Sequence, residues 1–317
     1  MNSGQQQNSF SPSASKQVDK RLPTTSCQDR KRVDSSNKFA LLNSYMTNVN
    51  VSVLEALYTT CTNDWQELNF IPAFNRLYLI CEGEGRIEIG DRSYWPVPGQ
   101  LVIMPAHVNQ SYTTINEHPY SKYWCHFQAL VGDRHLFQLM QVPYCITLAP
   151  ERWQQALHTF QMLTHVHRTA GWTAAFRTQG LLMELLSLYL EEAGFEQVSL
   201  PVSAAVEKIN EVLHYIENHL NEKISVQQLA SLLHLHPNYF ITFFREQMGE
   251  SPIQYINRVK VSRAQQLLLT SDLNVSEVAD LIGMDVYYFS RLFKQNTGFT
   301  PTAYKQQHVI FSSDTVR

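Results

Sequence analysis

Two sets of polar and basic side chains recur 49 positions apart near the C-terminal end of the chain. Asn and Arg can pair with base edges in a DNA groove, whereas Lys and Ser mostly contact phosphate. The first set is His236, Asn238, Thr242 and Arg245, and the second is Asp285, Tyr287, Ser290, Arg291 and Lys294. Each residue alone could be an ordinary solvated side chain, but the repeated set predicts a surface that contacts DNA.

The elements that must position these side chains are copies of one another. Residues 224–255 and 273–304 align without a gap, so that Val226, Ala230 and Phe240 match Val275, Ala279 and Phe289. Each copy predicts a short helix, a tight turn and a second, aromatic-rich helix. This is the helix-turn-helix unit, whose second helix enters the major groove. A helical repeat that binds another protein is the alternative.

Local sequence signals predict where these helices begin. Ser225 with Gln228 forms a capping box, and Asn274 with Glu277 repeats it. Glycines are expected to end both second helices. These are Gly249 and Gly298.

A third helix is expected to join the two copies, over about residues 252–269. Its apolar residues would pack between the copies and leave Arg258, Lys260 and Arg263 for phosphates. A stiff connector would hold the two recognition helices near one turn of DNA apart, about 34 Å.

The overall composition gives no sign of a nucleic-acid partner, because the formal net charge is −3. The local distribution of basic residues does favour such a partner, since residues 286–310 contain no acidic side chain while Arg291, Lys294 and Lys305 are present. The five cysteines are scattered without a Cys-x-x-Cys pair, which favours a reduced, cytoplasmic protein with free thiols. No apolar run is long enough to span a bilayer, and no membrane partner is expected.

Composition changes along the chain. Residues 1–45 are polar without periodicity and are predicted to be a disordered tail, and Met46 is a possible alternative start. Residues 50–130 predict many short strands, including 76–80, 86–89 and 101–104, with a hairpin turn at Gly90-Asp91. A small antiparallel sandwich or barrel is the expected fold of this part.

A helical region follows, from about residue 150 to 192. Between Trp172 and Leu190 it is apolar around most of its circumference, so two sides must be covered. We expect a partner subunit to cover one side, which predicts a homodimer, although packing within one subunit explains the same pattern. Gly194 and Pro201 indicate a linker.

The C-terminal part closely resembles the AraC/XylS family of bacterial transcription regulators over residues 204–306. The likeness rests on Pro252–Lys260, Tyr288–Lys294 and Gly298–Pro301. It implies two helix-turn-helix subdomains on a linking helix and ligand-dependent activation of transcription. The chain departs from the pattern in a short turn before Tyr288 and in Thr242, where the family commonly has Arg.

Residues 65–130 look like the sugar-sensing cupin barrel of the same family, through Gly83–Gly85, Pro98–Pro105 and Tyr123–Phe127. The expected fold class is therefore an α+β multidomain protein. It combines an N-terminal double-stranded β-helix (cupin-like) barrel and a helical dimerisation segment with a C-terminal all-α tandem helix-turn-helix. The expected domains are a tail (1–45), a ligand-sensing and dimerisation domain (46–195), a linker (196–203) and a DNA-binding domain (204–317).

Some cupin barrels are metalloenzymes, which resemble one another in a His-x-His pair with Glu on the first motif and a His on the second. Here residues 83–99 contain no histidine, and Gln110 stands where the second-motif histidine would be. His107 and His126 alone do not make a metal site, and His165 and His167 diverge on a helix. We therefore expect no catalytic residue, no metal and no cofactor.

A barrel without metal can still bind a small polar ligand through aromatic walls and a few polar groups. The candidate residues are Tyr78, His107, Gln110, Tyr112, Trp124 and His126. Trp124 could equally be core, and Arg86 and Glu88 are expected to pair on the outside.

The predicted function is a ligand-responsive, sequence-specific regulator that activates a carbohydrate-utilisation operon. Its partners would be double-stranded operator half-sites, a sugar effector, a second copy of the chain and, for an activator, RNA polymerase. The alternatives are a cupin metalloenzyme with a vestigial DNA-binding domain, or a stress or virulence regulator of the same family.

Overall fold

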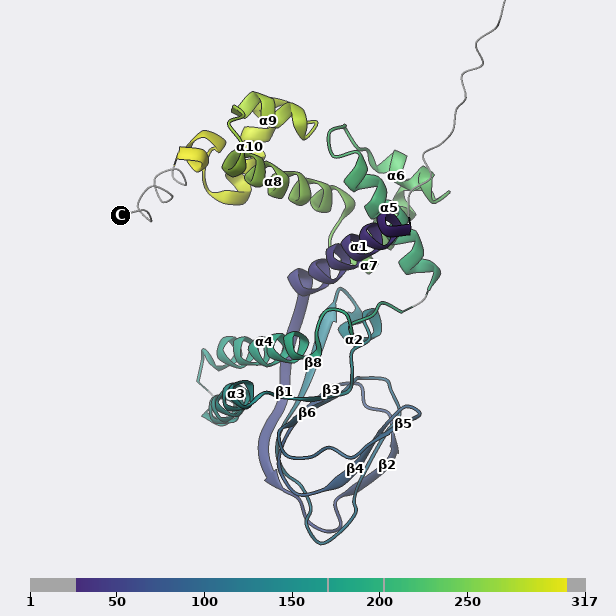
Figure 1. The fold of residues 1–317 in the computed structure, drawn as a ribbon, viewed down its shortest axis with the longest axis vertical. Coiled ribbons are helices and arrows are strands. Elements are labelled where there is room, and N and C mark those ends of the chain that lie inside the picture. The colour runs from purple at the N-terminus through teal and green to yellow at the C-terminus, as the bar shows by residue number, and fades with distance from the viewer. Residues whose placement is uncertain (1–26, 170, 202, 307–317) are drawn as a thin grey trace, which may run out of the picture.

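The N-terminal half is built on two antiparallel sheets in a computed structural model that describes residues 27–169, 171–201 and 203–306 (Figure 1). The larger sheet has the order β1-β8-β3-β6-β10, with β9 pairing to β8, and the smaller has the order β2-β7-β4-β5. The strands are β1 (Val49–Thr60), β2 (Gln66–Phe70), β3 (Asn75–Glu82), β4 (Gly85–Ile89), β5 (Arg92–Tyr94), β6 (Gln100–Met104), β7 (Gln110–Thr114), β8 (Ser121–Val131), β9 (Arg134–His135) and β10 (Cys145–Thr147).

Side-chain alternation explains why the larger sheet is covered on both faces. On β3, Tyr78 and Ile80 face a buried cluster with Ile87 of the smaller sheet, so this cluster lies between the sheets. Leu77 and Leu79 point the other way into a second core, shared with the helices. The strands expected at 76–80, 86–89 and 101–104 are confirmed.

The predicted hairpin turn is also confirmed. β4 pairs with β5 so that Ile89 lies opposite Arg92, with Gly90 and Asp91 between them. Gly90 has φ +62°, a conformation that a turn of this kind requires and that glycine adopts without strain. Arg86 and Glu88 form the expected ion pair on the outside.

Two helices, α3 (Pro150–Thr169) and α4 (Ala174–Ala193), pack on each other and on β1 at the outer face of the larger sheet. The buried side of α4 includes Leu182, Leu185 and Tyr189, whereas Phe176 is 77% exposed. Packing within one chain therefore covers most of the apolar circumference that suggested a dimer. A short helix, α2 (Leu136–Leu139), follows β9.

The prediction of a disordered tail is wrong for residues 27–45, which belong to helix α1 (Cys27–Asn48); residues 1–26 lie outside the described residues. Leu41, Leu42 and Tyr45 are buried on one side of α1, which contacts the first helices of the C-terminal half. The polar composition misled the prediction, because tertiary contacts at a few apolar positions stabilise a helix that has little periodicity of its own.

The C-terminal half is entirely helical within residues 203–306 as described, apart from its turns. Its helices are α5 (Ala204–Asn218), α6 (Val226–Leu232), α7 (Pro237–Met248), α8 (Pro252–Thr270), α9 (Val275–Leu281) and α10 (Val286–Thr297). α6 and α7 form the first helix-turn-helix, α9 and α10 form the second, and α8 joins them (Figure 1).

The two helix-turn-helix units have different cores. Phe240 and Phe244 of the first unit belong to the same buried cluster as the outer face of the large sheet. Phe289 and Phe293 of the second unit lie in a separate cluster, which includes Ala264 of α8. The first unit is thus continuous with the N-terminal half.

Candidate nucleic-acid interface and effector site

The capping residues that hold the two units are those the sequence predicted. The Ser225 hydroxyl accepts a hydrogen bond from the Gln228 main-chain N–H at 3.2 Å, and the Gln228 side chain accepts from the Ser225 N–H at 2.8 Å. Asn274 and Glu277 form the same reciprocal pair. Each box satisfies main-chain donors at a helix start and fixes the direction of the short first helix.

The turns between the helices are equal in length, spanning residues 233–236 and 282–285. His234 has φ +55° and its counterpart Gly283 has φ +60°. A Cβ at Gly283 would lie 2.4 Å from the main-chain oxygen of Asn221, so only glycine fits there. The two recognition helices, α7 and α10, are therefore set at the same turn geometry.

The candidate DNA-contacting residues of α7 are exposed. Asn238, Thr242 and Arg245 face solvent along this helix. His236 is also exposed, but its ring nitrogen accepts a hydrogen bond from the Asn238 N–H at 3.3 Å and caps the helix. His236 therefore has a structural role that the sequence did not reveal.

α10 presents a similar face. Tyr287 is 82% exposed, Arg291 and Lys294 are exposed, and Ser290 is half-buried. Asp285 caps this helix by accepting hydrogen bonds from two main-chain N–H groups, at 3.0 Å each. A carboxylate that caps a helix start is a poor partner for phosphate, and the exposed cationic side chains of α10 lie in its second and third turns.

Only part of the basic set expected on α8 reaches the surface. Arg263 is exposed. Arg258 is half-buried and paired with Glu250 at 2.6 Å. The prediction for Lys260 is corrected, because this residue is 2% exposed and its ammonium donates to the carbonyls of Glu222 (2.7 Å) and Gly283 (3.3 Å).

Burial lowers the pKa of Lys260. Two main-chain carbonyls are the partners that its ammonium finds inside the protein. Lys260 therefore links the segment before α6, at Glu222, to the turn between α9 and α10, at Gly283. Its buried ammonium is not placed to contact phosphate.

A polar groove lies between the start of α8 and α10, with a volume of 580 Å³. Arg291 of the predicted set lines it together with Gln254, Asn257 and Tyr288. The sequence reading missed the last three as surface candidates. Their signal was present, because polar residues at 254 and 257 are one helical turn apart on the predicted connector.

The candidate effector residues meet, with one exception, between the two sheets. Tyr78 and Gln110 are buried, and Tyr112, Trp124 and His126 are half-buried. The Trp124 ring lies 4.6 Å from that of His126, and its indole N–H donates to the Thr59 hydroxyl at 2.9 Å.

Burial, helped by nearby Arg76 and Lys122, lowers the pKa of His126 to about 4, so the ring is neutral at pH 7. The exception among the candidates is His107, which lies in an exposed loop with its Nε2 3.1 Å from that of His135.

Two buried cations between the sheets were missed from the sequence. Arg76 alternates with Tyr78 on β3, and Lys122 alternates with Trp124 on β8, so the strand period could have placed them on the same face. Arg76 pairs with Glu67 at 3.2 Å, and the Lys122 ammonium lies 4.0 Å from the centre of the Trp65 ring. The interior between the sheets thus combines aromatic walls, cations and an amide.

No group of three or more His, Cys, Asp or Glu side chains that could hold a metal ion occurs among the described residues. His167, on α3, instead pairs with Glu55 of β1 at 3.4 Å. In the same part of the chain, no helix has the length and apolar character to cross a membrane.

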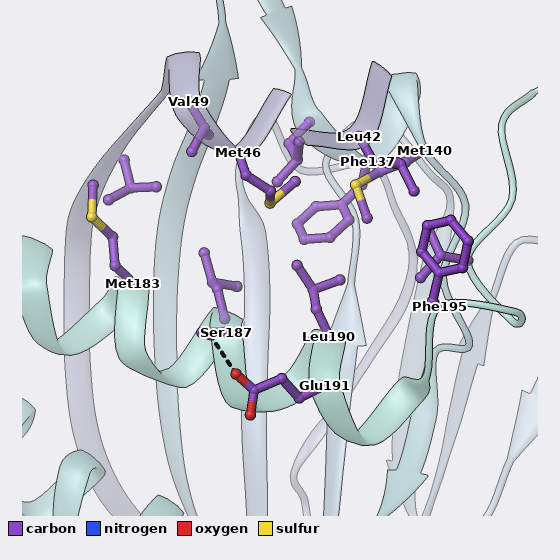
Figure 2. A pocket seen from close by; sticks show the side chains of 14 residues that line it. Leu42, Met46, Val49, Phe137, Met140, Met183, Ser187, Leu190, Glu191 and Phe195 are labelled. Carbon is purple, nitrogen blue, oxygen red and sulfur yellow. Dashed lines mark hydrogen bonds between the residues drawn. The ribbon is translucent and has the colours of Figure 1, made fainter. Parts of the chain in front are cut away.

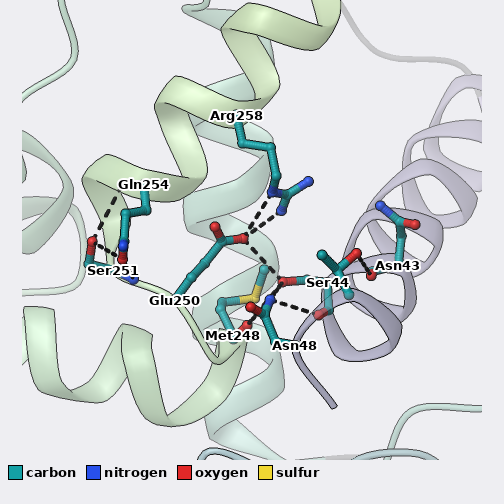
Figure 3. A network of polar contacts seen from close by, with 9 residues as sticks. Asn43, Ser44, Asn48, Met248, Glu250, Ser251, Gln254 and Arg258 are labelled. Atoms are coloured by element: carbon teal, nitrogen blue, oxygen red, sulfur yellow. Dashed lines mark hydrogen bonds and ion pairs between the residues drawn. The ribbon is translucent and has the colours of Figure 1, made fainter. Parts of the chain in front are cut away.

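A polar network joins α1 to the end of the first recognition helix (Figure 3). The Ser44 hydroxyl donates to the main-chain oxygen of Met248 at 3.0 Å, and the Asn48 amide donates to the same oxygen at 3.2 Å. A Cβ at Gly249, the αL residue that ends α7, would lie 2.6 Å from the Asn48 Cβ. The glycine thus ends the helix and permits close contact with α1.

Two protein families match this chain. The AraC-like ligand binding domain matches residues 74–186, and a helix-turn-helix domain matches residues 229–307. Together they cover more than half of the chain. The first contains the two sheets and most of α3 and α4, and the second contains both recognition helices and α8.

Several curated proteins are similar to the chain. The Msm operon regulatory protein of Streptococcus mutans is 23% identical over 63% of this chain and 72% of its own length. The MmsAB operon regulatory protein of Pseudomonas aeruginosa is 28% identical over 63% of this chain and 64% of its own length. The lactose operon transcription activator of Staphylococcus xylosus is 18% identical over 63% of this chain and 72% of its own length.

Among solved structures, the DNA-binding domain of the transcriptional factor AdpA, in complex with a target DNA, is 32% identical over 31% of this chain and 89% of that chain, with a TM-score of 0.30. The family matches extend over both halves of the fold, and the regulator has no enzyme role. The chain belongs to the AraC family of DNA-binding transcription regulators, with an AraC-like ligand-binding domain followed by a C-terminal helix-turn-helix domain.

Proposed function

We propose that this regulator binds operator DNA through α7 and α10 in two successive major-groove segments and activates a carbohydrate-utilisation operon in response to a sugar. The observation that carries the proposal is the matched exposure of two recognition helices on one connector. Arg245 occupies the last turn of α7 as Lys294 occupies that of α10, both facing solvent. Such repeated polar faces suit base-edge and phosphate contacts.

The effector part of the proposal rests on the space between the sheets, which we take to form a cupin-like double-stranded β-helix. Trp124 offers a ring on which a sugar can stack, and Gln110 has a buried side-chain oxygen without a hydrogen-bond partner. Pockets for polar ligands combine such walls with a few polar groups. The relative named for a lactose operon supports a sugar as the effector class.

The dimer also remains a proposal. Trp172, just before α4, and Phe176, in its first turn, are 95% and 77% exposed. Large aromatic side chains left in water at one end of a helix suit a contact with a second copy. A symmetric dimer would then read two operator half-sites.

Selection of DNA fragments by the purified full chain, followed by sequencing, tests the DNA-binding part. We expect enriched fragments that carry two half-sites, and binding that weakens steeply with added salt as counterions are released. Titration of sugars in the same assay tests the effector part. Trp124→Ala should abolish the sugar response without abolishing DNA binding, and failure to enrich any sequence at low salt would refute the proposed function.

A further inference from the structure

An apolar cavity of 490 Å³ lies outside the space between the sheets, on the other side of the large sheet (Figure 2). Its walls come from α1, the start of β1, α2, α4 and the segment that follows α4. On α4, Met183, Leu186 and Leu190 contribute from one helical face, at spacings of three and four residues. α1 contributes Leu42 and Met46, four residues apart.

The lining is almost entirely aliphatic, aromatic or thioether. Met46, Met140 and Met183 can adapt to ligands of different shape, because methionine is unbranched and polarisable. The two polar residues of the lining, Ser187 and Glu191, lie together at one side and are joined by a hydrogen bond of 3.1 Å (Figure 2).

The carboxylate of Glu191 is also held by Arg152, at 3.0 Å. A fixed carboxylate at the wall disfavours an anionic ligand and accepts a hydrogen bond from a hydroxyl. Phe195, in the segment after α4, also lines the cavity, and the Lys38 ammonium donates to its carbonyl at 2.7 Å and lies 4.2 Å from its ring.

We propose that this cavity is a second effector site, which binds a small, neutral, predominantly apolar molecule that can carry a hydroxyl group. Its volume falls within the range of about 300–1,000 Å³ that is typical of small-molecule pockets. The hollow is formed by five segments of one chain, and its single polar corner matches a small molecule with one hydroxyl better than a second protein surface.

The position of the cavity couples it to DNA recognition through α1. Leu42 and Met46 lie on the cavity side of this helix, whereas Ser44 and Asn48 lie about half a turn away and hold the Met248 carbonyl at the end of α7. A molecule that pushes on Leu42 and Met46 must therefore act on the contact with the first recognition helix. This step rests on the proposed DNA binding, whereas ligand binding itself does not.

Fluorescence titration of the full chain with N-phenyl-1-naphthylamine, a neutral apolar probe, tests the binding step. We expect saturable enhancement, displacement by decan-1-ol, and at least tenfold weaker displacement by decanoate. Met183→Arg places a charge at the rim and should weaken probe binding at least tenfold. Gln161→Arg, at an exposed position on α3, is the matched control and should leave it unchanged.

Two results would overturn the site. One is probe binding that Met183→Arg does not weaken while its circular dichroism stays native. The other is probe binding that falls as dimer forms, measured by sedimentation at rising protein concentration, because a second copy would then occupy the cavity.

Operator titrations with and without decan-1-ol test the coupling. We expect a change of about 5- to 150-fold in DNA affinity, the usual range for coupled sites. Ser44→Ala with Asn48→Ala should retain probe binding and lose this change. DNA binding measured without the alcohol reports on the proposed function separately, and an unchanged operator affinity at saturating alcohol would refute the coupling.

Discussion

Ser44 in α1 donates a buried hydrogen bond to the carbonyl of Met248, the last residue of the first recognition helix, across 204 positions of sequence. Asn48 donates to the same oxygen, and Arg134 of β9 donates to the side chain of Gln247 beside it at 2.8 Å. The carbonyls at a helix end have no partner inside the helix. The N-terminal half therefore supplies donors that the DNA-binding helix lacks.

Removing these donors should loosen the two halves. We expect Ser44→Ala and Asn48→Ala each to lower the free energy of unfolding by about 1 kcal/mol, because each removes a hydrogen bond to a partly buried carbonyl. Urea unfolding of the full chain measures this. Thr47→Ala is the control, since its hydroxyl donates within the same helix at an exposed position, and an equal loss in the control would contradict the assigned role.

Substitution of two arginines, one at a time, can distinguish contacts with base edges from contacts with phosphate. Arg291→Ala should weaken operator binding by about 1–3 kcal/mol and relax the preference at one base position, as expected for an arginine that pairs with guanine. Arg263→Ala should weaken all sequences alike. Parallel titrations with operator and random DNA measure both, and equal losses on the two DNAs for Arg291→Ala would show that it holds phosphate instead.

Lys260 should matter for stability and for the geometry between the two units. Lys260→Met keeps the length of the side chain but leaves the Glu222 and Gly283 carbonyls without their donor. We expect a loss of about 1–3 kcal/mol in unfolding free energy, with weaker operator binding. Lys294→Met is matched in chemistry but exposed, and it should weaken DNA binding while unfolding stays unchanged.

Acid should destabilise the N-terminal half through His126. Its pKa falls from 6.5 to about 4 on folding, so between these values the unfolded chain binds more protons than the folded one. Stability attributable to this ring is therefore unaffected above pH 6.5 and decreases as pH falls towards 4. His126→Phe should make the pH profile of unfolding shallower over this window, and an unchanged slope would show that folding does not lower the pKa of this ring.

The parts that local chemistry determines could be predicted from the sequence. Capping boxes, turn glycines and strand alternation involve residues close in sequence, so Ser225, Asn274 and Gly90 could be assigned in advance. The candidate DNA surface could be assigned by elimination, because Phe240, Phe244, Phe289 and Phe293 had to face inward, and all four are buried. Most of the remaining candidate side chains on α7 and α10 are exposed.

The rest depends on contacts between distant segments. The sequence around Lys260 does not indicate that its ammonium donates hydrogen bonds to two carbonyls that lie 38 and 23 positions away. Likewise, one side of α1 is buried because it packs against α5 and α7, which are distant in sequence. The two cations between the sheets are a different case, because the period of two along a strand places Arg76 on the same face as Tyr78 and Lys122 on the same face as Trp124.

The two recognition helices differ in what their cores connect to. Phe240 of α7 belongs to the buried cluster of the large sheet, whereas Phe289 of α10 belongs to a separate cluster. A strain that starts in the sheet reaches α7 directly through packed side chains. It reaches α10 less directly, along α8 and through the contacts of Lys260 and Gly283 with residues 221–222. Under the proposed function, the groove segment contacted by α7 would then respond to signals more strongly than the segment contacted by α10. Such a protein could stay bound to DNA through α10 while an effector changes the contacts that α7 makes.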